Sequence, residues 1–317
     1  MTADDPTREL EALRRRAFAI AYRMLGSVAE AEDIVQEALI RLQRVRDAGP
    51  PIESPQAYLS TIATRLSIDH LRSARVRREQ YAGDWLPEPL VESSEGDPVQ
   101  RAEMVESLSL AFLAVLERLS PEQRAVLLLR DVFGSGFDEI AEILERSQPS
   151  VRQLAVRARR HVREGRPRFA VSRRQHERLA TSFFAAVEGG DVQALEAVLA
   201  EDVVLRGDGG GKAPALGHSI IGRSDVARTL LAWVRMGMRF GGSIERVTVN
   251  GGPGALVLDP NGLLIGVWAL DIVGGAVRGV ASIVNPDKLR HVAEVGSLRD
   301  ALANSHRSGV EGAFGES

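Results

Sequence analysis

The sequence predicts two helical units followed by an α+β domain, and three observations support this fold class. Up to about residue 166 the apolar residues recur at the three- and four-residue spacing of amphipathic helices. After Arg168, short β-like runs alternate with glycine-rich turns. An acidic stretch rich in Pro, Gly and Ser, residues 81–106, divides the helical part in two. A chain of 317 residues is long enough for two or three domains.

The first unit is expected to hold three helices, over residues 8–25, 28–47 and 55–78, separated by glycine and proline breaks. The second of them carries an acidic cluster opposite its apolar stripe. Because Asp33 and Glu37 are like charges four residues apart, they cost an isolated helix a few tenths of a kcal/mol. Charge alone favours a solvated face, and the functional alternative is a surface that binds a basic protein.

The third helix combines an apolar side that includes Tyr58 with many arginines. Basic and aromatic side chains on one helix suit a single strand of nucleic acid, through phosphate contacts and base stacking. The simpler alternative is a generic basic helix end, since arginine also suits the negative end of the helix dipole. This pattern by itself leaves both alternatives open.

The second unit contains a helix-turn-helix pattern between Ser120 and Arg163. Ser120 is expected to cap a helix that begins at Pro121, because serine accepts backbone N–H bonds and proline fits the first helical position. After a glycine break, Asp138 is expected to cap the next helix. The last helix, from about Gln148, is rich in arginine on one side. This layout places the last helix in the major groove of DNA.

Charge is segregated along the chain, although the formal net charge is only −3. Residues 84–106 are acidic and residues 146–178 are dense in arginine. Local patches rather than totals set the affinity for phosphates, so the net charge does not exclude DNA. Arginine carries nearly all the positive charge, and the two lysines are Lys212 and Lys288.

The α+β domain is expected to contain helices over residues 175–188, 192–200 and 224–235, packed on a curved antiparallel sheet. The predicted strands are residues 203–206, 244–250, 255–259, 263–271 and 276–284. Residues 301–317 are expected to form a flexible tail, because they are rich in glycine and serine.

Composition excludes several kinds of site. The chain has no cysteine, which rules out disulfides and thiolate ligands, and its six histidines show no paired ligand spacing. We therefore expect no metal and no cofactor. No apolar run is long enough to cross a bilayer and no signal-like leader begins the chain, so we expect a cytoplasmic protein that does not bind a membrane.

Three motifs together resemble one family. Residues 31–38 (AEDIVQEA) are similar to the polymerase-binding helix of sigma region 2. Residues 57–63 (AYLSTIA) with 68–72 (IDHLR) resemble the part of region 2 that reads the −10 element. Residues 119–124 (LSPEQR) with the helix-turn-helix resemble region 4, where Glu145 stands in place of the usual turn glycine. Order and spacing match the extracytoplasmic-function (ECF) group of the sigma-70 family.

A narrower resemblance covers the linker and the C-terminal part. Residues 85–89 (WLPEP), 208–212 (DGGGK) and 285–289 (NPDKL) resemble the signature motifs of the ECF subgroup with a C-terminal SnoaL-like extension. The resemblance implies an NTF2-like cone fold for this extension. Both lysines of the chain fall in the last two motifs.

The resemblance implies a role for each motif. Region 2 would meet the coiled coil of the polymerase β′ subunit through Asp33, Gln36 and Glu37. Residues near the −10 element would be Arg65, Asp69, His70, Arg72 and Arg75. The last helix of region 4 would read the −35 element, with side chains near its N-terminal half reaching base edges and arginines further along it holding phosphates. These are Gln148, Ser150, Arg152, Gln153, Arg157 and Arg160.

The C-terminal motifs are expected to form an interdomain, regulatory contact with the linker. Its residues are Trp85, Pro87, Glu88, Asp208, Gly209, Gly210, Gly211, Lys212, Asn285, Pro286, Asp287 and Lys288. The glycine run would let the backbone approach a partner closely. The plainer alternatives are that Trp85 packs locally on the first helical unit, that the glycines form a flexible loop, and that residues 285–287 only end a strand.

The sequence thus predicts region 2 over residues 1–80, a linker over 81–106, region 4 over 107–168, the SnoaL-like domain over 169–300 and a tail over 301–317. The expected function is an alternative sigma factor that is not an enzyme. It would bind core RNA polymerase (β′ and β subunits) and promoter DNA, and its C-terminal domain would control it in cis. That domain would also be the place for a small ligand that the sequence does not identify.

Two rival functions are compatible with the sequence. One is an enzyme, with Asp202, Asp208, His218 or Asp271 as a base in the cone, although no pair of them has catalytic spacing. The other is a helix-turn-helix regulator with a ligand-binding or enzymatic C-terminal domain. The regulator leaves the motifs at residues 31–38 and 57–72 unexplained.

Overall fold

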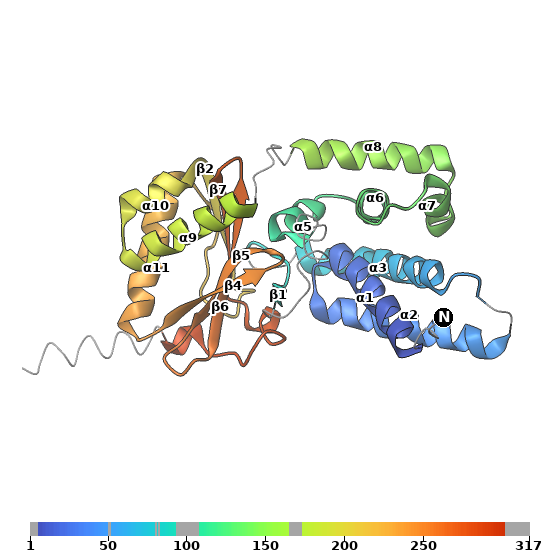
Figure 1. The fold of residues 1–317 in the computed structure, drawn as a ribbon, viewed down its shortest axis with the longest axis horizontal. Coiled ribbons are helices and arrows are strands. Elements are labelled where there is room, and N and C mark those ends of the chain that lie inside the picture. The colour runs from blue at the N-terminus through green and yellow to red at the C-terminus, as the bar shows by residue number, and fades with distance from the viewer. Residues whose placement is uncertain are drawn as a thin grey trace, which may run out of the picture. The chain divides into compact units, whose positions relative to one another are not determined.

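We describe the protein from a computed structural model, which covers residues 6–49, 52–79, 81, 83–92, 108–164 and 173–301 (Figure 1). The chain forms two compact units. One contains residues 1–79 and 113–166, and the other contains residues 80–112 and 167–317. The first part of the linker therefore folds with the C-terminal residues. Within the described ranges, no helix has the length and apolar character needed to cross a bilayer.

Three long helices, α1 (Pro6–Leu25), α2 (Val28–Ala48) and α3 (Pro55–Glu79), begin the first unit and agree closely with the predicted ranges. Ser27 caps α2, because its hydroxyl accepts a bond of 3.3 Å from the backbone N–H of Glu30. The apolar stripes of the helices meet in a shared core. Its buried members are Leu13, Ala38, Leu42, Leu59 and Ile62.

The helix-turn-helix follows the short helix α5 (Leu110–Leu116) and consists of α6 (Pro121–Leu127), the π-helical turn η1 (Leu128–Val132), α7 (Phe137–Leu144) and α8 (Gln148–Glu164). Ser120 caps α6 as predicted, in a capping box with Gln123.

The prediction for the start of α7 was wrong. Gly136 occupies the N-cap position without a side-chain bond, and Asp138 lies inside the first turn of α7. An acidic residue there still favours the helix, because it lies near the positive end of the dipole. The C-cap of the helix is Glu145, which has the left-handed conformation (φ 53°). The apolar side of α8 packs on α6 and α7 through Val151 and Ala155.

The other compact unit, called the C-terminal unit below, contains a seven-stranded sheet with the strand order β1-β4-β5-β6-β7-β2-β3. The strands are β1 (Val91–Glu92), β2 (Leu199–Asp208), β3 (Ile220–Ile221), β4 (Ser243–Val249), β5 (Gly252–Leu258), β6 (Leu264–Val273) and β7 (Ala276–Ile283). Its helices are α9 (Arg173–Gly189), α10 (Val192–Val198), α11 (Arg223–Arg239) and the 3-10 turn η2 (Pro286–Lys288).

Two features of this sheet differ from the prediction. It is mixed rather than antiparallel, because β2 pairs in parallel with β7. The linker contributes an edge strand, β1, in which Val91 pairs with Val249 of β4. Periodicity identifies strands but says little about which strands become neighbours, so neither pairing could be read from the chain.

Helices cover one face of the sheet (Figure 1), and the linker packs on the other together with residues of α5 and of the segment after η2. Alternation along β6 separates the two cores: Trp268 and Leu270 point to α9 and α11, whereas Val267 and Ala269 point to the opposite face. On that second face, Leu86 of the linker packs among the sheet side chains. The C-terminal unit therefore buries part of the linker as if it were its own element.

Candidate functional sites

Asp208, at the end of β2, is the centre of the contact between linker and C-terminal unit. Its carboxylate is fully buried. It accepts hydrogen bonds from the Tyr81 hydroxyl (2.6 Å), the Leu86 backbone N–H (2.8 Å), the Lys288 ammonium (2.8 Å) and the Gly210 N–H (3.1 Å). Because a buried carboxylate is costly unless it is paired and hydrogen-bonded, these four donors make this position stable.

Lys288 pairs with Asp208 in this cluster and also lies against two aromatic rings. Its Nζ lies 4.2 Å from the ring centroid of Trp85 and 5.0 Å from that of Tyr81. It also donates to the backbone carbonyl of Leu86. A buried ammonium is attracted by aromatic faces, most strongly by tryptophan. The two lysine-containing motifs and the Trp85 motif are thus in contact within one unit.

The glycine run provides the space for this contact. Gly210 has φ +57°, and a Cβ there would lie 2.2 Å from Asn285 Nδ2 and 3.0 Å from the Tyr81 hydroxyl. A Cβ on Gly209 would lie 2.3 Å from the carbonyl oxygen of Ala213. Both positions therefore require glycine for close approach of the backbone.

Replacing Gly210 by alanine is expected to lower the free energy of unfolding of the C-terminal unit by about 1–3 kcal/mol, because it adds a clash to an unfavourable φ. Urea unfolding followed by tryptophan fluorescence measures this loss. Gly217→Ala is the matched control, since a Cβ at Gly217 would meet nothing within 4 Å. Equal stability of the two variants would contradict the prediction.

Asn285, in the motif at residues 285–289, is hydrogen-bonded to the same cluster. Its side-chain Nδ2 donates to the Tyr81 hydroxyl (2.9 Å), and its Oδ1 accepts from the Asp287 N–H (3.1 Å), which caps η2. Lys212 pairs with Asp287 at a more exposed position. Pro87 is buried and Glu88 is half-buried in the docked linker.

Tyr81 makes the cluster sensitive to alkaline pH. Burial, and then the hydrogen bond to Asp208, raise the pKa of the Tyr81 phenol above its ordinary value of 10.0. The folded unit therefore keeps the phenol neutral at a pH where the unfolded chain ionises it. The stability from Tyr81 is complete below pH 10.0 and is lost as the pH rises beyond that value.

We expect the stability of the wild type to fall more steeply than that of Tyr81→Phe between about pH 9 and pH 11. Denaturant unfolding at a series of pH values tests this difference. Tyr58→Phe serves as the control, because Tyr58 lies in the first unit. Parallel pH profiles for the wild type and Tyr81→Phe would show the prediction to be wrong.

The predicted polymerase-binding residues lie on the surface of α2. Asp33 and Gln36 are exposed, and Glu37 is half-buried beside Arg41, with 2.7 Å between Glu37 Oε1 and Arg41 Nε. The opposite side of α2 is buried through Ala31, Ile34 and other residues. The acidic face is thus free of the core of the first unit.

Two of the predicted −10 residues on α3, Arg65 and Arg72, contact the helix-turn-helix of the same unit. Arg65 donates to the carbonyls of Ile143 (2.8 Å) and Glu142 (3.0 Å). Arg72 pairs with Glu122 (2.7 Å) and approaches Asp69 (3.4 Å).

His70 also has an acidic neighbour, since its Nε2 lies 3.0 Å from Glu30 Oε1. The Arg75 side chain lies outside the described residues.

The predicted −35 residues share the solvent side of α8. Gln148, Arg152, Gln153, Arg157 and Arg160 are exposed, and Ser150 is half-buried. The Arg152 guanidinium on α8 lies over the ring of Phe137 on α7, 5.2 Å from its centroid. This cation–π contact helps to orient the Arg152 side chain.

Comparison with known proteins decides the family. Residues 10–77 match the family model Sigma-70 region 2, and residues 109–162 match Sigma-70, region 4. The ECF RNA polymerase sigma factor SigJ of Mycobacterium tuberculosis is 38% identical over 294 residues, covering 88% of this chain and 92% of that relative. The chain belongs to the ECF sigma factors.

Similarity extends through the C-terminal unit. The probable ECF RNA polymerase sigma factor SigI of Mycobacterium tuberculosis is 33% identical over 279 residues, covering 86% of this sigma factor and 92% of that relative. The crystal structure of SigJ matches with a TM-score of 0.72 at 35% identity, covering 90% of this chain and 98% of that one. The predicted family and fold class, two helical sigma regions and an α+β cone domain, are confirmed.

The family also decides the function class. An ECF sigma factor is a transcription initiation factor that acts with RNA polymerase and promoter DNA, and it is not an enzyme. Two of the residues considered for catalysis are held in structural contacts. Asp208 is enclosed by the linker, and Asp202 pairs with Arg278 at the surface (2.9 Å). In the described ranges, no group of three His, Asp or Glu side chains is placed to hold a metal ion.

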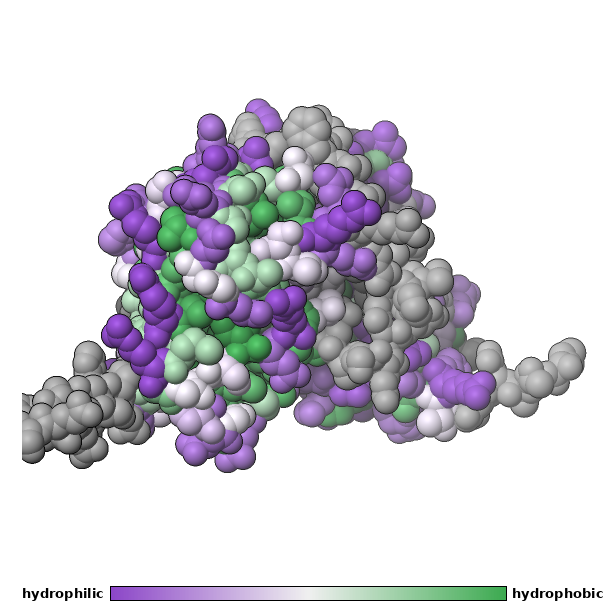
Figure 2. Space-filling model, turned by 60° about the vertical axis from the view of Figure 1, so that its left-hand side comes forward, coloured by the Kyte–Doolittle hydropathy of each residue, from purple (hydrophilic) through white to green (hydrophobic). Residues whose placement is uncertain are grey.

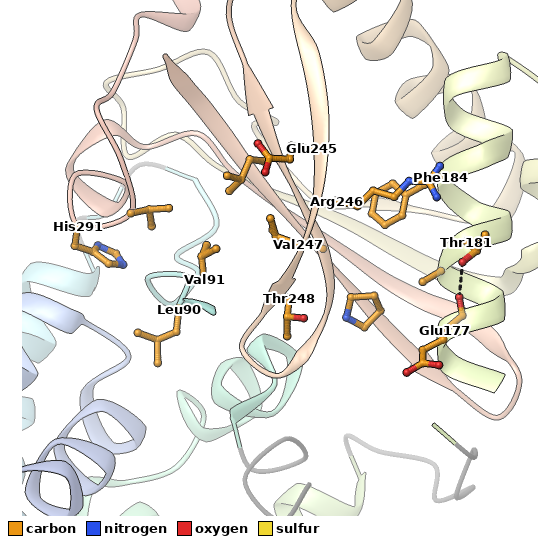
Figure 3. A pocket seen from close by; sticks show the side chains of 15 residues that line it. Leu90, Val91, Glu177, Thr181, Phe184, Glu245, Arg246, Val247, Thr248 and His291 are labelled. Atoms are coloured by element: carbon orange, nitrogen blue, oxygen red, sulfur yellow. Dashed lines mark hydrogen bonds between the residues drawn. The ribbon is translucent and has the colours of Figure 1, made fainter. Parts of the chain in front are cut away.

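The C-terminal unit of this sigma factor has a groove of about 940 Å³ that is lined by β4 and β5 (Figure 3). Leu90, Val91 and His291 lie on one side of β4, and Phe184 and Thr181 of α9 lie on the other. Figure 2 shows less polar residues between hydrophilic borders on one face of this unit. Among the described residues that line the groove, none belongs to the predicted sites.

Several contact residues of the docked linker were missed by sequence reasoning. They are Tyr81, Leu86, Asn250 and His291. Asn250 exchanges two bonds with the backbone of Leu90 (2.7 and 2.9 Å), and the His291 ring donates to the Pro89 carbonyl (2.8 Å). A tyrosine four residues before Trp85 and a turn asparagine with φ 50° are weak local signals that a pattern search passes over.

Proposed function

We propose that the C-terminal domain controls this sigma factor in cis by holding the linker between regions 2 and 4. The observation that carries the proposal is the buried carboxylate of Asp208, which binds both Tyr81 and the backbone of Leu86. A domain that merely followed the sigma regions would not need to bury part of the segment that connects them.

Docking limits how far the two promoter-reading regions can separate. Residues 81–92 lie between α3 and region 4 in the chain, and they are anchored along the C-terminal sheet from Tyr81 to β1. At about 3.4 Å per extended residue, docking of residues 81–92 removes about 40 Å of free contour length from the linker. The domain thereby sets the range over which regions 2 and 4 can be placed on DNA.

The remaining contacts of the proposal follow the predicted surfaces. Asp33, Gln36 and Glu37 bind the β′ subunit, and the exposed side of α8 reads the −35 element through base edges and phosphates. The arginines of α3 bind the opened strand of the −10 element, and region 4 meets the β subunit. The protein acts in the cytoplasm with its polymerase. A small ligand of the C-terminal domain would bind the groove beside Leu90 and Val91 of the docked linker.

Run-off transcription with core polymerase on genomic fragments, including the region upstream of the gene itself, tests the proposal. Trp85→Ala removes the ring that covers Lys288 and weakens docking, so the yield of transcript is expected to change severalfold. The matched control is Lys212→Ala, which breaks an exposed pair with Asp287 and leaves the buried cluster intact. An unchanged yield with Trp85→Ala would contradict control in cis.

A further inference from the structure

Arg65 on α3 is held by the end of α7. Its Nε and Nη2 donate to the carbonyls of Ile143 and Glu142, and its Nη1 lies 3.0 Å from the carboxylate of Glu145. The last carbonyls of a helix lack partners within the helix and carry the negative end of its dipole. A guanidinium at this position therefore satisfies the end of α7, and the same guanidinium is then unavailable to a phosphate.

Glu145 has an unusual backbone for its residue type. Its φ is 53°, in the left-handed region that helix ends usually fill with glycine. A glutamate pays a conformational penalty there that glycine avoids, and what it adds is a carboxylate beside Arg65. The structure thus offers a reason for the replacement of the turn glycine that the sequence showed but did not explain.

Arg72 is held in the same way by the start of α6. Its Nη2 lies 2.7 Å from the carboxylate of Glu122. Burial acts to raise the pKa of Glu122, but the hydrogen bond from Arg72 and further favourable contacts outweigh it and hold that pKa below its usual value. Glu122 is therefore charged at neutral pH and presents Arg72 with the kind of group that a phosphate would present.

The core of the same contact is buried and basic. Arg124 of α6 is 3% exposed, donates to the backbone carbonyl of Met24 at the end of α1, and pairs with Glu117 (2.8 Å). Arg16 and Arg23 of α1 both lie 5.5 Å from the centroid of Phe133. Regions 2 and 4 are therefore packed together through side chains of both, with α6 and α7 beside α3 (Figure 1).

We propose that Glu122 and Glu145 are internal competitors of promoter DNA, which hold Arg65 and Arg72 and keep regions 2 and 4 packed together until DNA and polymerase displace them. The proposal rests on the proposed role of Arg65 and Arg72 at the −10 element. Both ion pairs are at least partly exposed, so each contributes little and can be displaced. A weak latch of this kind suits a contact that must open at every initiation event.

The absence of native cysteine allows a direct test in the full chain. Cysteines placed at Arg44 on α2 and Val156 on α8, both exposed, carry a donor and an acceptor dye for energy transfer. In the variant E122Q/E145G the ratio of packed to open molecules is expected to fall by roughly 2- to 30-fold. E142Q is the matched control, because it removes one charge next to the latch while Arg65 binds only the Glu142 backbone.

A second measurement uses a 20-nucleotide oligo-dT strand as the probe. E122Q/E145G is expected to bind it more tightly than the wild type by a similar factor, and E142Q is expected to bind it as the wild type does. Glycine suits the conformation of residue 145, so E145G is not expected to unfold the turn, and circular dichroism checks this.

The two proposals fail in different ways. Energy transfer that is the same in E122Q/E145G and in the wild type overturns the latch, whatever transcription does. If R65A/R72A leaves run-off transcription and oligo-dT binding unchanged, the role of these arginines in DNA binding is wrong, and competition with DNA is overturned with it. Opening of the packed form together with tighter, arginine-dependent binding of the strand supports the latch.

Discussion

Replacing Asp208 by alanine is expected to lower the free energy of unfolding of the C-terminal unit by about 3–5 kcal/mol and to release the linker. The loss is large because the substitution leaves Lys288, whose side chain is 7% exposed, without its carboxylate. It also leaves the Tyr81 hydroxyl and the Leu86 N–H without their acceptor. Each unsatisfied buried donor adds to the cost.

Two measurements check this result. Urea unfolding gives the change in stability, and limited chymotrypsin digestion reports release of the linker through cleavage after Trp85. Asp202→Ala is the matched control, because the Asp202 side chain is 65% exposed and its pair with Arg278 is expected to contribute at most about 1 kcal/mol. Equal stability and equal protease resistance in the two variants would rule out Asp208 as the centre of docking.

Lys288→Met should be milder than Asp208→Ala. Without Lys288, the carboxylate of Asp208 retains the donors from Tyr81, Leu86 and Gly210. Without Asp208, Lys288 loses its carboxylate and keeps the Leu86 carbonyl and the two aromatic rings, which are weaker partners for a buried charge. The asymmetry follows from the number and strength of the contacts that each buried charge keeps.

Local signals predicted most of the helical part of the fold. The cap at Ser120 and the stripe on α8 depend on residues within a few positions of each other, so the sequence contains the whole cause. The cap at Asp138 failed for a related reason, because the helix starts at Phe137 and places Asp138 within its first turn. Boundaries shift by a residue or two where several residues can serve as caps.

Long-range contacts could be predicted only where a rare residue type singled out a position in the sequence. The scarcity of lysine singled out Lys288, and the resemblance linked it to the motif of Trp85. Nothing near Tyr81 indicates that it binds a carboxylate 127 residues further along the chain. The same holds for Arg65, which the sequence assigns to nucleic acid and which the folded unit ties to carbonyls of α7. Partners that distant leave no periodic pattern in either segment.

Reversing two charges on α2, Asp33→Lys with Glu37→Lys, is expected to weaken binding to core polymerase about 100-fold or more, because like charges brought face to face cost several kcal/mol. Asp33 is exposed and Glu37 is half-buried beside Arg41, so the helix should survive both changes. The Glu37→Lys change replaces the ion pair with Arg41 by two like charges four residues apart, which costs the helix only a few tenths of a kcal/mol.

Titration of labelled sigma factor with core polymerase at two salt concentrations measures the effect. Asp47→Lys is the matched control: Asp47 is exposed on the same helix, bonded to Gln43 (2.8 Å) and outside the acidic face. If the face binds a basic surface, the double variant loses affinity and much of its salt dependence, whereas the control keeps both. Equal affinity of the double variant and the control would instead support the other interpretation of the charge pattern on α2, a solvated face with no partner.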